Sequence, residues 1–250
     1  MQKMCAAGSG DGTGIARTHI RYRAPGSENP SRSLVNFSTQ RTNNDHDYEY
    51  PGGAMSLDFV AIDFETANPK RASVIQIGLA KVRDGEIVKT ACSMVFPPNG
   101  FTNFAERNIA VHGLTPKSVH GAPYWPEILA RLVKFTGDLP LVAHNAPFER
   151  SVIVQASEAE GLTPPDFRYC CTQKLAQRLL PDAPSFKLDR LTDYLGRPAF
   201  SHHDAGDDAV ACAELALAIA EHAGIGDFDD LWPTEDLAKR TLNQYRKAAA

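Results

Sequence analysis

Two carboxylates close an apolar run, with one aromatic residue between them. Asp63 and Glu65 end the segment 59–66, which reads FVAIDFET. Side chains of an extended strand alternate between its faces with a rise of about 3.3 Å per residue, so both acids are expected on one side, about 6 to 7 Å apart at Cα. Two carboxylates so placed repel each other. Protonation of one of them or a divalent cation bound between them relieves this repulsion, and oxygen ligands suit Mg²⁺ or Mn²⁺. The pattern indicates a strand ending in a metal site, with an ordinary strand end and two solvated acids as the alternative.

A further acid, Glu149, falls in the first turn of a predicted helix. It follows the sequence HNAPF at 144–148, directly after a short apolar run. Acids in a first turn stabilise a helix by about 0.3 to 1 kcal/mol, so helix stability alone is a sufficient explanation for Glu149. Asn145 is a natural residue to cap the same helix. The chemical interpretation of Glu149 therefore needs support from elsewhere in the chain.

A histidine and another acid stand five residues apart near the last long helix. His203 and Asp208 lie in the segment SHHDAGDDA at 201–209. Positions five apart on a helix are separated by about 140°, so His203 is predicted on the entering loop, folded back toward Asp208. There a histidine can act as a general base. Asp204 and Asp207 are interpreted as acids of the helix start, and a solvated acidic helix start remains the alternative for the whole segment.

The elements that must position these residues follow from apolar periodicity and turn signals. Asp84-Gly85 between two β-rich runs predicts a hairpin. A looser region is expected around 97–124. Strands are predicted at about 58–64, 73–83, 86–96, 139–143 and 168–171, and helices at about 125–136, 147–160, 172–179, 187–195 and 206–223. Three antiparallel strands followed by strand-helix units indicate a mixed α/β sheet flanked by helices.

The chain is predicted to hold one folded domain between two tails. Residues 1–54 lack an apolar period and are rich in small polar residues, which predicts a disordered N-terminal extension and makes Met55 a plausible native start. The domain is expected at 55–224. Residues 225–250 are predicted to form a C-terminal tail or a short helix.

Composition limits the possible partners. The 250 residues are 43% hydrophobic and 22% charged, with a net charge of −4, so no global positive field attracts a long polyanion and any nucleic-acid contact must be local. That favours work on a chain end. The five cysteines lack a C-x-x-C pair and are interpreted as reduced, which favours a cytoplasmic setting. No apolar run is long enough to span a membrane.

Taken together and in order, the three acidic motifs resemble those of the DEDDh 3′-to-5′ exonucleases, the DnaQ-like group. Its relatives include the epsilon subunit of bacterial DNA polymerase III and RNase T. The resemblance rests on D-x-E, then H-N-A-x-F with an acid next, then H-x-A-x-x-D-A. It also includes the segment VHGLT at 111–115. The similarity runs from about 56 to 223. It implies a ribonuclease H-like fold with a five-stranded sheet, and a substrate that is the 3′ end of a single strand, with a DNA polymerase or repair complex as a possible partner.

The same resemblance implies a two-metal mechanism. Asp63, Glu65, Glu149 and Asp208 would hold two Mg²⁺ or Mn²⁺ ions about 3.5 to 4 Å apart, and His203 would assist the attacking water. Candidates for seating the terminal nucleotide are Phe64, Thr66, Ala67, His112, Leu114, Asn145 and Phe148.

One position departs from the family pattern, because the second motif normally carries Asp where this chain has Glu149. A displacement of about 1 Å in a catalytic site can cost about 10²-fold in rate. An impaired module that binds nucleic-acid ends or a polymerase partner is therefore an alternative to an active enzyme. An RNA-trimming exoribonuclease is a second alternative. A small-molecule phosphatase is disfavoured, since no phosphate-cradling Gly-rich loop is present. The oligomeric state stays open.

Overall fold

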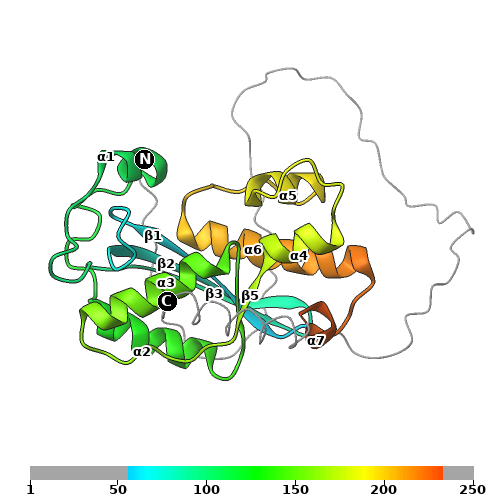
Figure 1. The fold of residues 1–250 in the computed structure, drawn as a ribbon, viewed down its shortest axis with the longest axis horizontal. Coiled ribbons are helices and arrows are strands. Elements are labelled where there is room, and N and C mark those ends of the chain that lie inside the picture. The colour runs from blue at the N-terminus through cyan, green and yellow to red at the C-terminus, as the bar shows by residue number, and fades with distance from the viewer. Residues whose placement is uncertain (1–55, 233–250) are drawn as a thin grey trace, which may run out of the picture. The chain divides into compact units, whose positions relative to one another are not determined.

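A five-stranded mixed sheet forms the centre of the protein (Figure 1). The computed structural model describes residues 56–232, so the predicted extension and the alternative start at Met55 lie outside the described residues, as does 233–250. The strands occur in the order β3-β2-β1-β4-β5, with β1 antiparallel to β2 and parallel to β4. Their bounds are β1 Phe59–Thr66, β2 Val74–Arg83, β3 Glu86–Met94, β4 Leu141–Ala143 and β5 Tyr169–Cys171. The predicted mixed sheet is confirmed.

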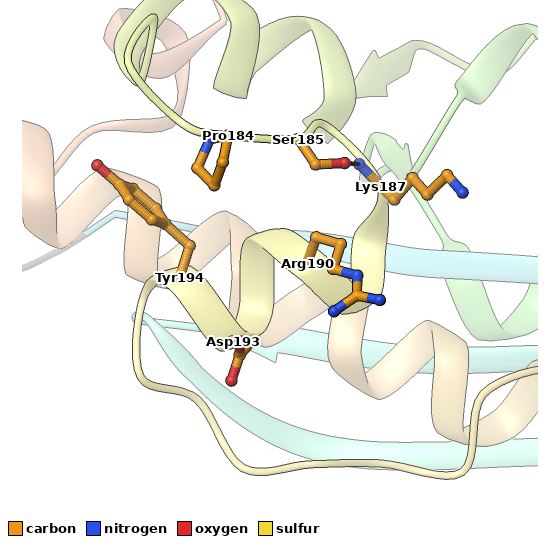
Figure 2. A pocket seen from close by; sticks show the side chains of 6 residues that line it. All are labelled: Pro184, Ser185, Lys187, Arg190, Asp193 and Tyr194. Atoms are coloured by element: carbon orange, nitrogen blue, oxygen red, sulfur yellow. Dashed lines mark hydrogen bonds between the residues drawn. The ribbon is translucent and has the colours of Figure 1, made fainter.

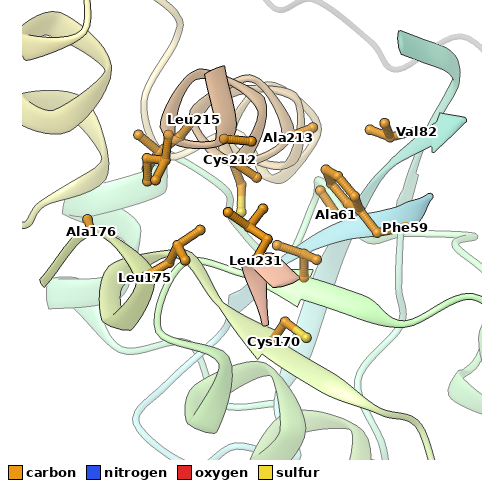
Figure 3. Packing of buried hydrophobic residues seen from close by; sticks show 14 of the residues in the cluster. Phe59, Ala61, Val82, Cys170, Leu175, Ala176, Cys212, Ala213, Leu215 and Leu231 are labelled. Carbon is orange, nitrogen blue, oxygen red and sulfur yellow. The ribbon is translucent and has the colours of Figure 1, made fainter. Parts of the chain in front are cut away.

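Helices cover both faces of the sheet. Figure 1 shows α2 and α3 on one side and α4, α5 and α6 on the other. The helix bounds are α1 Glu106–His112, α2 Trp125–Thr136, α3 Ala146–Ala159, α4 Thr172–Leu179, α5 Leu188–Tyr194, α6 Ala205–Ala223 and α7 Phe228–Leu231. Each face has its own core, because strand side chains alternate. Phe59 and Ala61 pack with α6 (Figure 3), whereas Ile62 and Phe64 pack with α2 and α3.

This alternation decides where the acids point. Phe59 and Ala61 occupy odd positions of β1 and face α6, so Asp63 and Glu65 continue the same row toward the end of the strand. The row begins in the core and ends in carboxylates. The α6 side of β1 therefore carries Asp63 and Glu65, and the side chains on the other side of β1 pack in the apolar core with α2 and α3.

After residue 224, where a tail or a short helix is predicted, the described chain forms the short helix α7. Ser56 N–H donates to the carbonyl of Gly226 at 2.9 Å. The rings of Phe228 and Trp232 lie 6.1 and 6.2 Å from that of Phe59. The side chains of Phe228, Leu231 and Trp232 lie on one face of a short helix and are buried in the same core as Phe59. Residues 225–232 thus cover the core next to the first strand.

Two general expectations can be compared with the described part of the chain. Within residues 56–232, no helix has both the length and the apolar character needed to cross a bilayer. Cys170, Cys171 and Cys212 are free thiols. The helix α1 was not predicted, since the region before α2 was expected to be irregular.

Candidate active site

Three carboxylates converge at the end of β1. Ligand atoms of Asp63, Glu65 and Asp208 all lie within 4.8 Å of one another. The first two come from one strand and the third from the first turn of α6, more than 140 residues later in the chain. Asp208 is only 4% exposed. Three oxygen donors at this spacing form a group that could hold a divalent metal ion.

Gly78 allows α6 to approach closely enough to bring Asp208 into this group. It is paired with Asp63 across β1 and β2. A Cβ atom at position 78 would lie 1.7 Å from the carbonyl oxygen of Ala205, the first residue of α6. Only glycine fits such an approach, so the helix start lies directly on the strand beside the acids.

Gln76 fixes the same helix start by hydrogen bonds. It is paired with Glu65 across the strands and its side chain is fully buried. The Oε1 atom accepts a hydrogen bond from Ala205 N–H at 3.2 Å, and Nε2 donates to Asp204 Oδ2 at 3.2 Å. Asp204 in turn caps the helix by accepting from the N–H groups of Gly206 and Asp207. The capping interpretation of Asp204 agrees with the structure, whereas the contact with Gln76 was missed.

Two histidines lie against Asp208. The backbone N–H of His203 donates to Asp208 Oδ2 at 2.8 Å, and His203 adopts a left-handed conformation with φ of 69°. It therefore lies on the entering loop and folds back, as the spacing indicates. His202 was not anticipated. Its Nδ1 lies 2.8 Å from Asp208 Oδ1, and its ring stacks on that of His203 with centroids 4.1 Å apart. Partial burial, followed by the neighbouring His202, lowers the pKa of His203.

Glu149 is buried beside Asp63. The residue is 2% exposed, and its Oε2 atom has no hydrogen-bond partner in the described structure. Burial raises the pKa of Glu149 well above its ordinary value. After burial itself, the charge of Glu149 has the largest effect among those that raise the pKa of Asp63. Glu149 therefore belongs to the electrostatic environment of the three clustered carboxylates, and a solvated helix-stabilising acid does not describe it.

Asn145 does not cap α3 as the sequence suggested. It occupies the position before the helix, but with a left-handed φ of 75° and no capping hydrogen bond from its side chain. The side chain is exposed. His144, one residue earlier, is held on both ring nitrogens by Thr172 and by the carbonyl of Phe186. Burial lowers the pKa of His144 to about 4, so this ring is a neutral structural group.

The electrostatics of the site favour a bound cation. Burial, and then the charge of Asp208, raises the pKa of Glu65 to about 8. Asp63 is raised well above its ordinary pKa by burial and by its acidic neighbours. The raised pKa values show that these carboxylates cannot all ionise easily without a positive charge nearby. Together with the unpartnered buried Oε2 atom of Glu149, they match the oxygen donor set of a divalent metal. The residues present therefore fit the predicted kind of cofactor.

Residues predicted to seat a nucleotide divide into two groups. Phe64 is 3% exposed and packs on Trp125, so its ring belongs to the core and only its backbone remains for contact with a nucleotide. Thr66 and Ala67 are also buried, and only their backbone remains for contact. The other group surrounds the end of α1. His112 Nε2 lies 3.2 Å from the carbonyl oxygen of Thr66, and the Leu114 N–H donates to His112 Nδ1 at 2.9 Å.

A separate cavity lies along α5. Its volume is about 390 Å³, and Figure 2 shows Tyr194 and Pro184 toward one end with Lys187 and Arg190 toward the other. Asp193 completes the mixed-charge lining together with Ser185. None of the predicted site residues lines this cavity. We therefore assign the chemistry to the carboxylates at the end of β1.

Comparison with known proteins identifies the family. Residues 60–216 match the family model RNase_T, described as exonuclease. The chain belongs to this exonuclease family. Its members are exonucleases, and the five-stranded mixed sheet is the fold that the three motifs indicated.

Individual relatives of the exonuclease family agree with this assignment. The chain is 34% identical over 160 residues to the PolC-type DNA polymerase III of Clostridium perfringens, which covers 63% of this chain and 11% of that protein. The match thus spans about a tenth of the polymerase. Among solved structures, exonuclease X in complex with 5′-overhanging duplex DNA has a TM-score of 0.55 and 26% identity over 66% of this chain and 93% of its own. The nuclease domain of 3′hExo, a DEDDh member bound to rAMP, shares the fold with a TM-score of 0.58 at 18% identity, over 68% and 94%.

Proposed function

We propose that this protein is a divalent-metal-dependent 3′-to-5′ exonuclease that removes nucleotides from the 3′ end of single-stranded DNA and releases nucleoside 5′-monophosphates. The observation that carries the proposal is the convergence of Asp63, Glu65 and Asp208 within 4.8 Å, with Glu149 acting on Asp63. The acids alone would repel a phosphodiester. Cations held by them invert the local charge, which makes this end of the sheet suited to phosphoryl chemistry.

In this proposal the four acids would hold two Mg²⁺ or Mn²⁺ ions. Asp63 would be the central ligand, because after burial itself Glu149, Asp208 and Glu65 all raise its pKa. When bound, the ions neutralise the carboxylates and polarise the phosphate and water oxygens. Glu149 contributes the oxygen that has no protein partner.

His203 acts as the general base. Its lowered pKa keeps the ring neutral near pH 7, so it can accept a proton from the attacking water. The water oxygen bonds to phosphorus as the bond from phosphorus to the 3′ oxygen of the preceding nucleotide breaks, and solvent protonates that leaving oxygen. The backbone N–H of His203 donates to Asp208, so the proposed base and this proposed metal ligand lie next to each other.

The terminal nucleotide is expected next to the end of α1. His112 links the backbone of Thr66 to that of Leu114, so the turn after α1 is held beside the end of β1. We assign the backbone of Thr66 and Ala67, together with His112, Leu114, Asn145 and Phe148, to this seat. DNA is favoured over RNA by the PolC-type and exonuclease X relatives. Association with a polymerase or a repair complex is suggested by the PolC similarity alone.

A labelled oligonucleotide tests the proposal. A single strand of DNA carrying a 5′ fluorophore, and an RNA of the same sequence, are incubated with protein in Mg²⁺, Mn²⁺ or EDTA. Stepwise shortening of the DNA from its 3′ end, with nucleoside 5′-monophosphates detected by mass spectrometry and no reaction in EDTA, is the expected result. Faster shortening of RNA would favour an exoribonuclease.

The alternative is an inactive module that binds nucleic-acid ends. Glu149 in place of the family's Asp is the observation that favours it. Retained binding of the labelled strand without any shortening in either metal would support this alternative and end the enzyme proposal.

A further inference from the structure

The guanidinium of Arg71 lies beside the acidic site and has no assigned task. Arg71 belongs to the loop between β1 and β2 and is half-buried. Its Cζ atom lies 4.2 Å from the centroid of the Phe148 ring. Phe148 directly precedes Glu149. Against the larger effect of burial, the charge of Arg71 lowers the pKa of Glu149. A fixed positive charge therefore stands next to the acids, on the side where α3 begins.

Arg71 differs from other arginines in its partners. Arg83, Arg131, Arg168 and Arg197 each form an ion pair with a carboxylate. Within residues 56–232, Arg71 forms no ion pair and no hydrogen bond, and its guanidinium lies over the Phe148 ring. A half-buried guanidinium has lost part of its hydration, and N–H donors without a partner then raise the free energy of the folded protein. An anionic ligand that accepts hydrogen bonds from them would remove this desolvation penalty.

The ring contact presents the guanidinium for recognition of an anion. Stacking covers one flat face of the group and leaves the N–H donors at its edges available. Those donors form a planar fork that matches two oxygens of a phosphate. Because the Phe148 ring already restrains the side chain, less rotamer freedom is lost when the anion binds.

We propose that Arg71 binds a phosphate of the substrate strand adjacent to the scissile one. This inference rests on the proposed exonuclease function and adds a residue that binds the substrate strand. The scissile phosphate must lie among the four acids and their cations. Arg71 forms no ion pair with any of those carboxylates, so they do not occupy its N–H donors, which remain available to the neighbouring phosphate. A strand with several phosphates is therefore held more tightly than a mononucleotide.

Binding measurements separate this role from catalysis. Fluorescence anisotropy with a 5′-labelled DNA decamer, in Ca²⁺ to suppress turnover, compares wild type with Arg71→Gln and Arg71→Lys. We expect Arg71→Gln to raise the Kd about 10-fold or more, and Arg71→Lys to fall between the two, because lysine keeps the charge and loses the fork. The plot of log Kd against log salt should become shallower by about 0.7 for Arg71→Gln, as for one lost phosphate contact on a single strand.

A matched control removes a cation at the far end of the sheet. Lys134 is exposed in the last turn of α2. Its neighbour Phe135 lies under Lys81, which pairs with the beginning of β1. Lys134→Gln changes the net charge equally and should leave the decamer Kd within about twofold and the salt slope unaltered.

Several outcomes would overturn the inference. An Arg71→Gln decamer Kd or salt slope equal to that of wild type would refute the phosphate contact. A thermal destabilisation by Arg71→Gln with the salt slope unchanged would show that Arg71 only supports the Phe148 ring. The affinity for thymidine 5′-monophosphate is measured by competition with the decamer. If Arg71→Gln weakens this affinity as much as it weakens decamer binding, the assignment to a neighbouring phosphate is refuted. Because binding is read without turnover, an inactive wild-type protein would refute the proposed function and still leave this test decisive.

Discussion

Replacing Gly78 by alanine tests whether the close contact between β2 and α6 determines the geometry of the acids. The added Cβ would lie 1.7 Å from the Ala205 carbonyl oxygen and 2.5 Å from the Gly206 nitrogen, and both are backbone atoms that cannot rotate away. The start of α6 must therefore move by about 1 Å or more, and Asp208 moves with it. Overpacking of this kind typically costs about 1 to 3 kcal/mol of stability. A misplacement of about 1 Å in a catalytic site typically costs about 10²-fold in rate.

Two measurements and a milder variant complete this test. Urea unfolding reports the stability change, and shortening of the labelled DNA in Mn²⁺ reports the rate. Gly206→Ala serves as the comparison, because its Cβ would lie 3.1 Å from Asp204 Oδ1 and 3.2 Å from Cys92 Cβ, contacts that small shifts can relieve. Gly206→Ala should therefore lose less stability and less of the hydrolysis rate than Gly78→Ala. A Gly78→Ala protein with wild-type stability and wild-type rate would refute the claim that this contact sets the site.

Three further predictions concern the acids and the base. His203→Ala should lower the turnover rate about 10²- to 10⁴-fold while keeping the thermal stabilisation by Mn²⁺, and unchanged turnover would exclude His203 as the base. Glu149→Asp should keep or raise activity and Glu149→Ala should abolish it, whereas indifference to both changes would leave Glu149 as a helix residue only. Burial raises the pKa of Glu65 from 4.5 to about 8, so between these values the folded metal-free protein holds a proton that the unfolded chain lacks, and stability falls as pH rises. Above pH 6.5, where unfolded-state histidines are mostly neutral, the metal-free Tm should therefore fall toward pH 8 and Mn²⁺ should raise it most at pH 8. A metal-free Tm that increases over this interval would contradict the assignment.

The sequence predicts best those elements whose apolar residues recur with a clear period. The bounds of α2 and α4 coincide with the predicted ranges, and the Asp84-Gly85 turn joins two paired strands with both residues at positive φ. The helix α1 contains no buried residue, so it lacks the apolar period that would have revealed it. For residues 225–232 the sequence predicts a tail or a short helix, because four helical residues are too short a segment for periodicity to decide between the two.

The candidate site was predictable where local geometry determines it. Strand alternation places Asp63 and Glu65 on one face, and the spacing of His203 and Asp208 requires the loop that folds back. The supporting contacts depend on pairing between distant segments. Gln76 and Gly78 act through the register of β2 with β1 and through the approach of α6, neither of which the spacing along the chain contains. Asn145 fails as a cap because its backbone is left-handed, a conformation that its sequence context did not specify.

Manganese-dependent shortening of a 5′-labelled DNA strand, compared between wild type and Asp63→Asn, tests the central claim most directly. Asp63 is the carboxylate whose pKa all the other acids of the site raise, so its loss should remove cation binding and hydrolysis together. We expect stepwise loss of 3′ nucleotides as 5′-monophosphates by the wild type, and no shortening by Asp63→Asn, whose Tm should no longer respond to Mn²⁺. Equal shortening by both proteins, or none by the wild type while it still binds the strand, would contradict the account.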